Sequence, residues 1–355
     1  MKINITEIEP GAARTLPEAP FGFGRIFSNH MLVRTYKSDG WEEAKIQPYG
    51  PIQMELSMSA LHYGQEIFEG TKAYRRPDGH INLFRIDQNI KRFNRSAERM
   101  QLPMMDEEEQ LEAIATLIKL DSSWVPDTAN TTLYIRPAMV SSEATIGSLT
   151  SNEALFFILL SPVDPYFANG FAPISVYVED QYVRAVRGGV GEAKTGGNYA
   201  ASMQATKKAI AAGYKQVVWL DAIERRYVEE MGGMNIFFVY GDKLVTSPLT
   251  GTILPGVTRD SLLTLGADLG YEVEERMIDI QALMADIKSG ACTEAFACGT
   301  AAVIAPIGKM GYQGQDVTVN GNEVGRVTRH LYEELTGIQF GRIPDRFGWT
   351  LKIEK

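Results

Sequence analysis

The stretch RGGVGEAKTGGNYAAS, residues 187–202, holds a single lysine, Lys194, between glycines and just before a predicted helix that Asn198 would cap. A glycine-rich turn that opens into a helix favours phosphate binding, because the first N–H groups of a helix point at an anion. The Walker pattern requires glycine directly before the lysine, and Ala193 stands there instead. The stretch therefore predicts no P-loop, and by itself it leaves open whether Lys194 is reactive or only a solvated loop residue.

Hydrophobic periodicity on both sides of this stretch predicts alternating strands and helices. In DQNIKRFNRSAERMQLP, Ile90, Phe93 and Ala97 share one helical face. Runs of β-branched and aromatic residues predict strands. The pattern, which has no repeats, is typical of an α/β (α+β) enzyme. The predicted helices span 87–102, 106–120, 198–213 and 257–270, and the predicted strands span 131–140, 154–161, 173–179, 215–221, 234–240 and 293–299.

The length of the chain predicts two domains. It has 355 residues, 45% of them hydrophobic, and domains usually hold roughly 100 to 200 residues. The segment SPVDPYFANGFAP, residues 161–173, gathers prolines, glycine, asparagine and aspartate between two predicted strands. We expect a smaller N-terminal domain at 1–166, an interdomain connection at 167–173 and a larger domain at 174–355.

Composition excludes several classes of partner. The net charge of −9, with acids and bases interspersed, offers no basic surface for nucleic acid. No stretch approaches the roughly 20 apolar residues of a membrane span, and the first residues lack the apolar core of a signal peptide. Cys292 and Cys298 are too few for a disulfide framework and are spaced unlike a zinc site. We expect a cytoplasmic protein that binds no metal, nucleic acid or membrane.

Two adjacent acids, Glu229 and Glu230, precede two glycines and an apolar strand in VEEMGGMNIFF, residues 228–238. Either acid alone could be a solvated turn carboxylate. Pyridoxal phosphate (PLP) would give such an acid a function, because this cofactor is an electron sink when a lysine holds its aldehyde and an acid keeps its ring nitrogen protonated. A carboxylate at about 4 Å and an effective dielectric of about 20 contributes up to about 4 kcal/mol to the protonated ring. That energy raises the pKa of the pyridine by about three units.

The phosphate of such a cofactor needs backbone donors and a cation. In TILPGVTRDSLL a Pro-Gly turn opens directly into a helix, so the amides of Val257 and Thr258 are predicted to point at an anion. Many helix starts share this pattern, which makes the prediction a general one. The cation would come from the helix predicted at 87–102, on which Arg92 and Arg95 are both candidates.

Taken together, these segments resemble the branched-chain amino acid aminotransferases, which are PLP enzymes of fold type IV. The resemblance covers nearly the whole chain in the family's order and approximate spacing. It implies a smaller N-terminal α/β domain, a larger C-terminal pseudo-barrel domain, and a homodimer with active sites near the subunit interface. Its motifs are EIFEGTKAYR (66–75), NIKRFNRSAERMQLP (89–103), YIRP (134–137), GGVGEAKTGGNY (188–199), EEMGGMNIF (229–237), ILPGVTR (253–259) and FACGTAA (296–302).

The resemblance also implies roles for single residues. It assigns Lys194 to the Schiff base with the cofactor aldehyde and Glu230 to the pyridine nitrogen. Tyr199 would hydrogen-bond the phenolic oxygen of PLP. Phosphate contacts would come from Arg92, Val257, Thr258 and Thr300, and substrate contacts from Phe23, Tyr63, Phe68, Tyr134, Arg136, Tyr166, Thr300 and Ala301.

The implied reaction is reversible transfer of the amino group from L-leucine, L-isoleucine or L-valine to 2-oxoglutarate. One pocket must then accept both an aliphatic and a carboxylate side chain. Strand alternation puts Tyr134 and Arg136 on the same face, where the guanidinium could meet the γ-carboxylate of glutamate. The alternative is that Arg136 lies at a solvated strand end. Tyr63 is expected to reach in from the other subunit.

This sequence departs from the animal members at two places. They carry a threonine where Gly233 stands, and their redox-sensing Cys-x-x-Cys falls on Ala302 and Ala305. Within the fold, a D-amino acid aminotransferase or an aminodeoxychorismate lyase would share the lysine and the glutamate, but YIRP and EIFEGTKAYR argue against both. A phosphate-ligand binding protein without catalysis is the alternative from another class.

Overall fold

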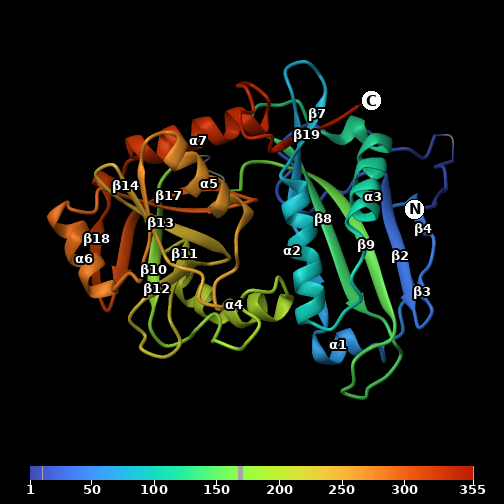
Figure 1. Cartoon of the computed structure of the whole chain (residues 1–355), viewed down its shortest axis with the longest axis horizontal. Coiled ribbons are helices and arrows are strands. Elements are labelled where there is room, and N and C mark those ends of the chain that lie inside the picture. Colours follow the sequence, from blue (N-terminus) through green and yellow to red (C-terminus); the bar gives the residue numbers. More distant parts are fainter. Residues whose placement is uncertain (10, 167–170, 355) are drawn as a thin grey trace. The chain divides into compact units, whose positions relative to one another are not determined.

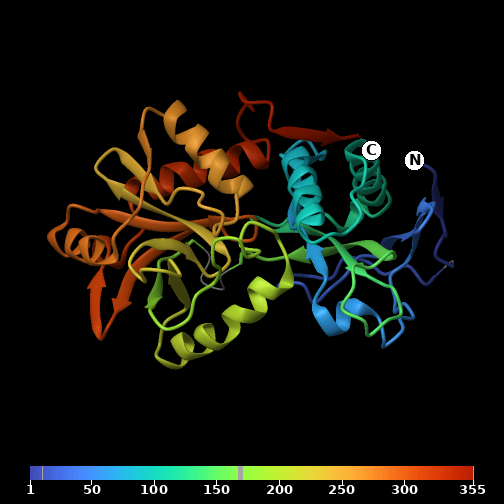
Figure 2. The ribbon, with the colours of Figure 1, turned by 60° about the horizontal axis from the view of Figure 1, so that its bottom comes forward.

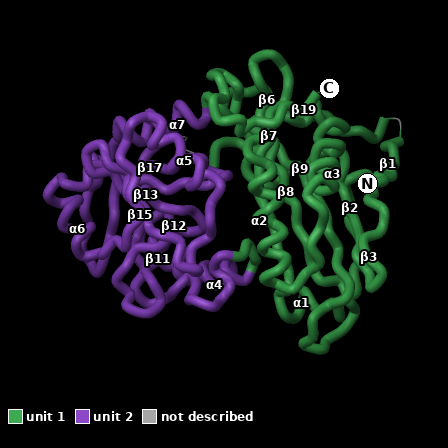
Figure 3. Tube along the Cα trace, in the orientation of Figure 1, with its two compact units in different colours: residues 1–166, 193–196, 337–355 green, residues 167–192, 197–336 purple. Residues whose placement is uncertain are grey.

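The structure is a computed structural model, and it describes every residue except 10, 167–170 and 355. The chain divides into two compact units, coloured separately in Figure 3. Most of the connection expected at 167–173 lies outside the described residues. The first unit holds residues 1–166, 193–196 and 337–355, and the second holds 167–192 and 197–336.

Two segments therefore group differently from our expectation of a domain at 174–355. The short segment that contains Lys194 belongs to the first unit. The C-terminal segment also returns to it, because its last strand pairs antiparallel with the strand at 81–84, with Ile353 opposite Ile81.

The first unit is built on a ten-stranded sheet with the order β1-β4-β2-β9-β8-β6-β7-β19, to which β3 adds beside β2 and β5 beside β8. All its pairings are antiparallel except that of β1 with β4. The strands are β1 (Ile3–Ile5), β2 (His30–Lys37), β3 (Gly40–Trp41), β4 (Ala44–Pro48), β5 (Glu66–Phe68), β6 (Thr71–Arg75), β7 (Ile81–Phe84), β8 (Thr132–Ser141), β9 (Ala154–Val163) and β19 (Thr350–Ile353).

Two helices cover one face of this sheet, α2 (Ile86–Arg99) and α3 (Glu107–Leu120), as Figures 1 and 2 show. Both were predicted. The Asp106 side chain caps α3 by accepting the Glu109 N–H at 3.0 Å. The predicted face of α2 packs into the core of the unit. The other helical segments here are α1 (Ser59–Tyr63) and the 3-10 turn Ser122–Trp124.

The second unit contains a barrel. Its nine-stranded sheet runs β12-β11-β10-β17-β16-β13-β14-β15, with β18 beside β17, and an additional β12–β13 pairing closes six strands into a ring. The pseudo-barrel implied by the resemblance is thus confirmed. The strands are β10 (Ile174–Glu179), β11 (Gln216–Leu220), β12 (Val228–Met231), β13 (Met234–Tyr240), β14 (Lys243–Thr246), β15 (Glu272–Glu275), β16 (Glu294–Gly299), β17 (Val303–Tyr312) and β18 (Gln315–Thr318).

The barrel helices begin at polar or glycine-rich positions. The helix after the lysine stretch begins at Gly196, so the prediction that Asn198 caps it was wrong. Asn198 lies inside the first turn, and its side chain donates to the Val190 carbonyl at 2.8 Å.

No helix of the described chain is long and apolar enough to cross a membrane. The helical segments are α4 (Gly196–Ala211), α5 (Val257–Asp268), α6 (Ile280–Ser289), α7 (Arg326–Gln339) and the 3-10 turn Asn320–Asn322.

Candidate active site

The backbone around Lys194 is fixed by hydrogen bonds to β5 and α2. Phe68 N–H donates to the Lys194 carbonyl at 3.0 Å, and Lys194 N–H donates to Ser96 Oγ at 2.9 Å. The next residue, Thr195, donates its hydroxyl to the Glu66 carbonyl at 2.7 Å. Lys194 is half-buried in this setting. The interpretation of Lys194 as a solvated loop residue is therefore not supported.

An aromatic and cationic wall lies beside this lysine in the first unit. Lys194 Nζ is 4.9 Å from the centre of the Phe68 ring, and the guanidinium carbon of Arg136 is 4.7 Å from the same ring. Arg136 Nη2 donates to the Tyr134 hydroxyl at 3.3 Å. Arg136 Nε is buried and has no hydrogen-bond partner among the described residues. Arg136 thus shares a face with Tyr134 within β8 rather than lying at a solvated strand end.

Two further predicted substrate residues continue this wall. The Phe23 ring lies 5.0 Å from that of Tyr134 and 5.7 Å from that of Tyr166, in edge-on contacts. Tyr63 makes a different contact: its hydroxyl donates to the Ile146 carbonyl at 2.5 Å, and half of the residue is exposed. The structure therefore groups Phe23, Tyr134 and Tyr166 and gives Tyr63 separate neighbours.

Of the two candidate arginines on α2, only Arg92 is buried, while Arg95 is exposed. Arg92 forms a bidentate ion pair with Glu69, in which Nε lies 2.6 Å from Oε1 and Nη2 lies 3.0 Å from Oε2. Sequence reasoning missed Glu69. Its only signal in the sequence is an acid directly after the apolar pair Ile67 and Phe68.

Sequence reasoning also missed Lys72, a buried cation on β6. Its Cα lies opposite that of Tyr134 in the β6–β8 register, and the residue is 5% exposed. Burial lowers the pKa of Lys72 to about 7. A buried lysine on the sheet face that carries Tyr134 adds an ionisable group to this part of the first unit.

In the second unit, the adjacent acids of β12 have different partners, because neighbouring residues of a strand point to opposite faces. Glu230 is 1% exposed and forms an ion pair with Arg184, with 2.8 Å between Oε2 and Nη1. Asn235 Nδ2 donates to the other oxygen of Glu230 at 3.2 Å. Glu229 accepts instead from the Thr252 hydroxyl at 2.6 Å, and burial raises its pKa. Sequence reasoning did not find Arg184, because it lies in irregular backbone without a periodic signal.

Val257 and Thr258, whose backbone amides were predicted to bind phosphate, are the first two residues of α5. Their N–H groups therefore have no acceptor within the helix. Gly256 precedes them and supplies no capping side chain. A Cβ at Gly256 would come within 2.0 Å of Asn235 Oδ1, so only glycine fits there. This glycine turn leaves backbone donors in the arrangement that suits a phosphate.

Tyr199 and Gly233 are neighbours in the second unit. A Cβ at Gly233 would lie 3.1 Å from the Tyr199 ring, so the threonine of the animal members would press on that ring here. Thr300 and Ala301 form the turn that follows β16. The predicted residues thus fall into two sets. The first unit holds Phe23, Tyr63, Phe68, Arg92, Tyr134, Arg136, Tyr166 and Lys194, and the second holds Tyr199, Glu230, Val257, Thr258, Thr300 and Ala301.

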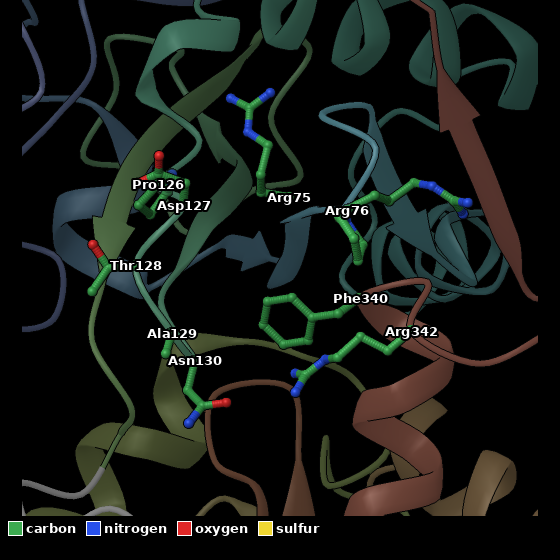
Figure 4. Close-up of a pocket in the computed structure, with 10 residues that line it drawn as sticks. Arg75, Arg76, Pro126, Asp127, Thr128, Ala129, Asn130, Phe340 and Arg342 are labelled. Atoms are coloured by element: carbon green, nitrogen blue, oxygen red, sulfur yellow. The ribbon is translucent and has the colours of Figure 1, made fainter.

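A separate pocket of about 350 Å³ lies in the first unit and contains none of these residues. Figure 4 shows Phe340 and Arg342 facing the segment 126–130 across it. Its other arginines already have protein partners: Arg75 Nη2 donates to the Ser122 carbonyl at 2.6 Å, and Arg76 pairs with an aspartate. We do not assign the chemistry to this pocket.

Comparison with known proteins decides the family. Residues 66–310 match the amino-transferase class IV family. The chain belongs to this family. Branched-chain-amino-acid transaminase 1 of Bacillus subtilis (strain 168) is 48% identical to this class IV aminotransferase over 94% of each chain.

Solved structures agree with this assignment. The branched-chain amino acid aminotransferase from Escherichia coli matches this class IV aminotransferase with a TM-score of 0.73 at 25% identity, over 92% of this chain and 99% of its own. The T.th. branched-chain amino acid aminotransferase with pyridoxamine 5'-phosphate gives a TM-score of 0.74 at 26% identity, over 90% of this chain and 98% of its own.

Proposed function

We propose that this class IV aminotransferase moves the amino group of L-leucine, L-isoleucine or L-valine reversibly to 2-oxoglutarate and gives the branched 2-oxo acid and L-glutamate. The observation that carries the proposal is the 48% identity, over 94% of each chain, to a branched-chain-amino-acid transaminase. The side chains described above supply the chemistry that such a reaction needs. No described feature favours a non-catalytic phosphate-binding protein over this reaction.

Class IV aminotransferases use PLP, and several of the residues described above have the chemistry that its groups need. Lys194 would hold the cofactor aldehyde and Glu230 would pair with the ring nitrogen. The α5 amides, at a turn where a Cβ would collide with Asn235, suit the phosphate. When bound, the cofactor withdraws electrons from the amino acid and so makes its Cα proton acidic. Further cofactor contacts are proposed for Arg92, Tyr199 and Thr300.

Lys194 is the proposed base. Its backbone is held by Phe68 and Ser96, so its amine can be placed repeatedly at the Cα of a bound amino acid. A lysine amine in its neutral form can act as a general base. In this role Nζ removes the Cα proton in one direction and restores it in the other.

We propose that Arg136 lets one pocket bind both the γ-carboxylate of glutamate and the aliphatic side chain of a branched-chain amino acid. Its Nε is buried without a partner among the described residues, while its face packs on Phe68. A γ-carboxylate would supply the missing acceptor. An aliphatic side chain would leave Arg136 on the aromatic rings and its bond to Tyr134 in place.

We further propose a homodimer. Residues near α1 and the loop after β8 are apolar and strongly exposed, a feature that marks interaction surfaces. Tyr63 belongs to this exposed set, and its hydroxyl donates to the Ile146 carbonyl of the loop. A single-subunit mass in analytical ultracentrifugation would contradict this. The exposed set is Ile52, Met54, Leu56, Leu61, Tyr63, Ile146 and Leu149.

A cytoplasmic location is part of the same proposal. Cys292 and Cys298 are both free and buried, which suits a reducing compartment.

The test of the function is to add L-leucine or D-alanine to the purified holoenzyme and follow the visible band of the bound cofactor. L-Leucine should discharge this band and produce the branched 2-oxo acid, and D-alanine should not. Lys194→Ala should retain cofactor through its phosphate but lose turnover, because neither the covalent link nor the base remains. Near-wild-type turnover of Lys194→Ala, or preference for D-alanine, would overturn the proposal.

A further inference from the structure

Glu69 lies in the link between β5 and β6, and its carboxylate is held from several sides. Besides the two bonds from Arg92, its Oε2 accepts from Asn89 Nδ2 at 2.9 Å and from the Gly70 N–H at 3.0 Å. The backbone N–H of Glu69 donates to the Pro137 carbonyl at 2.8 Å. These bonds hold the carboxylate of Glu69 in one position, so it can orient the flexible side chain of Arg92.

Arg92 gains a defined orientation from this anchor. A guanidinium carries five N–H donors in one plane, and the pair with Glu69 uses the edge formed by Nε and Nη2. Because two of its nitrogens are bonded to one carboxylate, the plane of the guanidinium is fixed. The side chains of both residues are almost fully buried, at 4% and 2% exposure. Solvent therefore competes little with the pair.

The charge balance shows that Glu69 is held ionised. Burial alone would raise the pKa of Glu69, but the charge and hydrogen bonds of Arg92, the charge of Lys194 and the bond from Asn89 hold this pKa below its ordinary value. The positive charges of Arg92 and Lys194, the proposed phosphate ligand and the proposed catalytic lysine, thus both stabilise the ionised form of Glu69.

We propose that Glu69 is a positioning residue that fixes the guanidinium of Arg92 for the cofactor phosphate. This inference rests on the proposed function, in which Arg92 binds that phosphate. A side chain as long as arginine has many rotamers, and a bidentate carboxylate selects one of them before the anion arrives.

The experiment compares the affinity of the full-length protein for PLP and for pyridoxal, which lacks the phosphate. The main variant is Glu69→Asp, because the shorter side chain keeps the negative charge but moves the carboxylate away from Arg92 by the length of one methylene. Its affinity for PLP should fall about tenfold, as expected for loss of a charge-assisted hydrogen bond. Its affinity for pyridoxal should stay within about twofold of wild type. A general loss of folding would lower both affinities equally.

The matched control is Glu109→Asp, which shortens the carboxylate of another ion pair in the same unit, that with Arg34. It should leave both affinities unchanged. If Glu69→Asp does not fold, Asn89→Ser removes one of the bonds that hold Glu69 and should cause a smaller fall in PLP affinity alone.

Arg92→Gln separates the inference from the function on which it rests. This variant should lose PLP affinity but keep pyridoxal affinity, and adding Glu69→Asp to it should cause no further loss. If Arg92→Gln leaves PLP affinity intact, the phosphate role of Arg92 is wrong. If Arg92→Gln weakens PLP and Glu69→Asp does not, the phosphate role stands and the inference about Glu69 is overturned.

Discussion

Glu229 and Glu230 are chemically identical neighbours in β12, yet their surroundings differ. Glu230 pairs with Arg184 and Asn235, whereas Glu229 accepts from Thr252. We expect Glu230→Gln to slow the first half-reaction with L-leucine about a hundredfold, since loss of roughly 3 kcal/mol at the ring nitrogen is worth about two decades. Glu229→Gln should stay within about threefold of wild type.

Single-turnover loss of the cofactor band measures both rates. Cofactor content is determined first, because Glu230→Gln leaves the buried Arg184 without its carboxylate. A slow Glu229 variant beside a fast Glu230 variant would show that the role belongs to the other acid.

Arg136 carries the residue-scale prediction about specificity. Arg136→Met should lower kcat/KM for glutamate by roughly ten- to a hundredfold, because a charge-assisted bond is worth about 1.5 to 3 kcal/mol. L-Leucine gains nothing comparable from the guanidinium, so its value should change much less. The two half-reactions are measured separately in single turnovers. Equal losses for both substrates would mean that Arg136 supports the fold and that another group binds the γ-carboxylate.

Residues with a distinctive local sequence were predictable, and their partners were not. Lys194 stands out because glycines surround it and a helix follows. Glu69, Arg184 and Lys72 carry no comparable local pattern. Their environments come from strands and loops distant in sequence, such as the β6–β8 register that puts Lys72 opposite Tyr134.

At the scale of elements, α7 depends on a carboxylate from β16. Glu294 accepts the Val327 N–H at 3.0 Å and both the N–H and the hydroxyl of Thr328, at 2.8 and 2.7 Å. These bonds satisfy N–H groups at the start of the helix, which have no acceptor within it. Glu294→Ala should therefore lower the free energy of unfolding by about 1 to 3 kcal/mol.

Urea denaturation followed by circular dichroism checks this value. Glu323→Ala is the control, because Glu323 is exposed just before the same helix, and exposed substitutions usually stay within about 0.5 kcal/mol. Equal effects of the two variants would show that the cap contributes nothing.

Periodicity predicted the elements better than their ends. The apolar face of α2 was correct, yet the helix ends at Arg99, before the predicted position 102. Gln101 follows with a left-handed φ of 53°. The spacing of hydrophobic residues does not predict such a backbone conformation at the end of a helix. The start of α4 was misplaced for a related reason. Asn198 has the chemistry of a cap but bonds to Val190 from inside the helix.

At the scale of the whole molecule, the barrel and the return of the C-terminus could not be derived from periodicity. The closing pair β12–β13 is a local hairpin. The ring also requires β10 to pair with β17, and these two strands are more than a hundred residues apart in the sequence. The β7–β19 pair is equally remote. Only the family resemblance implied a barrel, because local patterns carry no information about which distant strands will pair.

Lys72 makes the stability of the chain depend on pH in a predictable direction. Burial lowers its pKa from 10.5 to about 7 in the folded state. Between these values the unfolded chain binds a proton that the folded chain does not, so the free energy of unfolding rises with pH, by at most about 1.4 kcal/mol per unit. Below pH 7 both states bind it, and the cost of burying the charge is fully present. Above 10.5 this cost has gone.

Lys72→Met should therefore stabilise the protein at pH 6, and the advantage over wild type should shrink by about 2 kcal/mol between pH 7.5 and 9. Urea denaturation of both proteins at pH 6, 7.5 and 9 measures this difference and cancels the contributions of every other titrating group. Lys45→Met, at an exposed position on β4, should give a difference that does not change with pH. Parallel stability curves for wild type and Lys72→Met would show instead that Lys72 keeps its proton in the folded state and that burial does not lower its pKa.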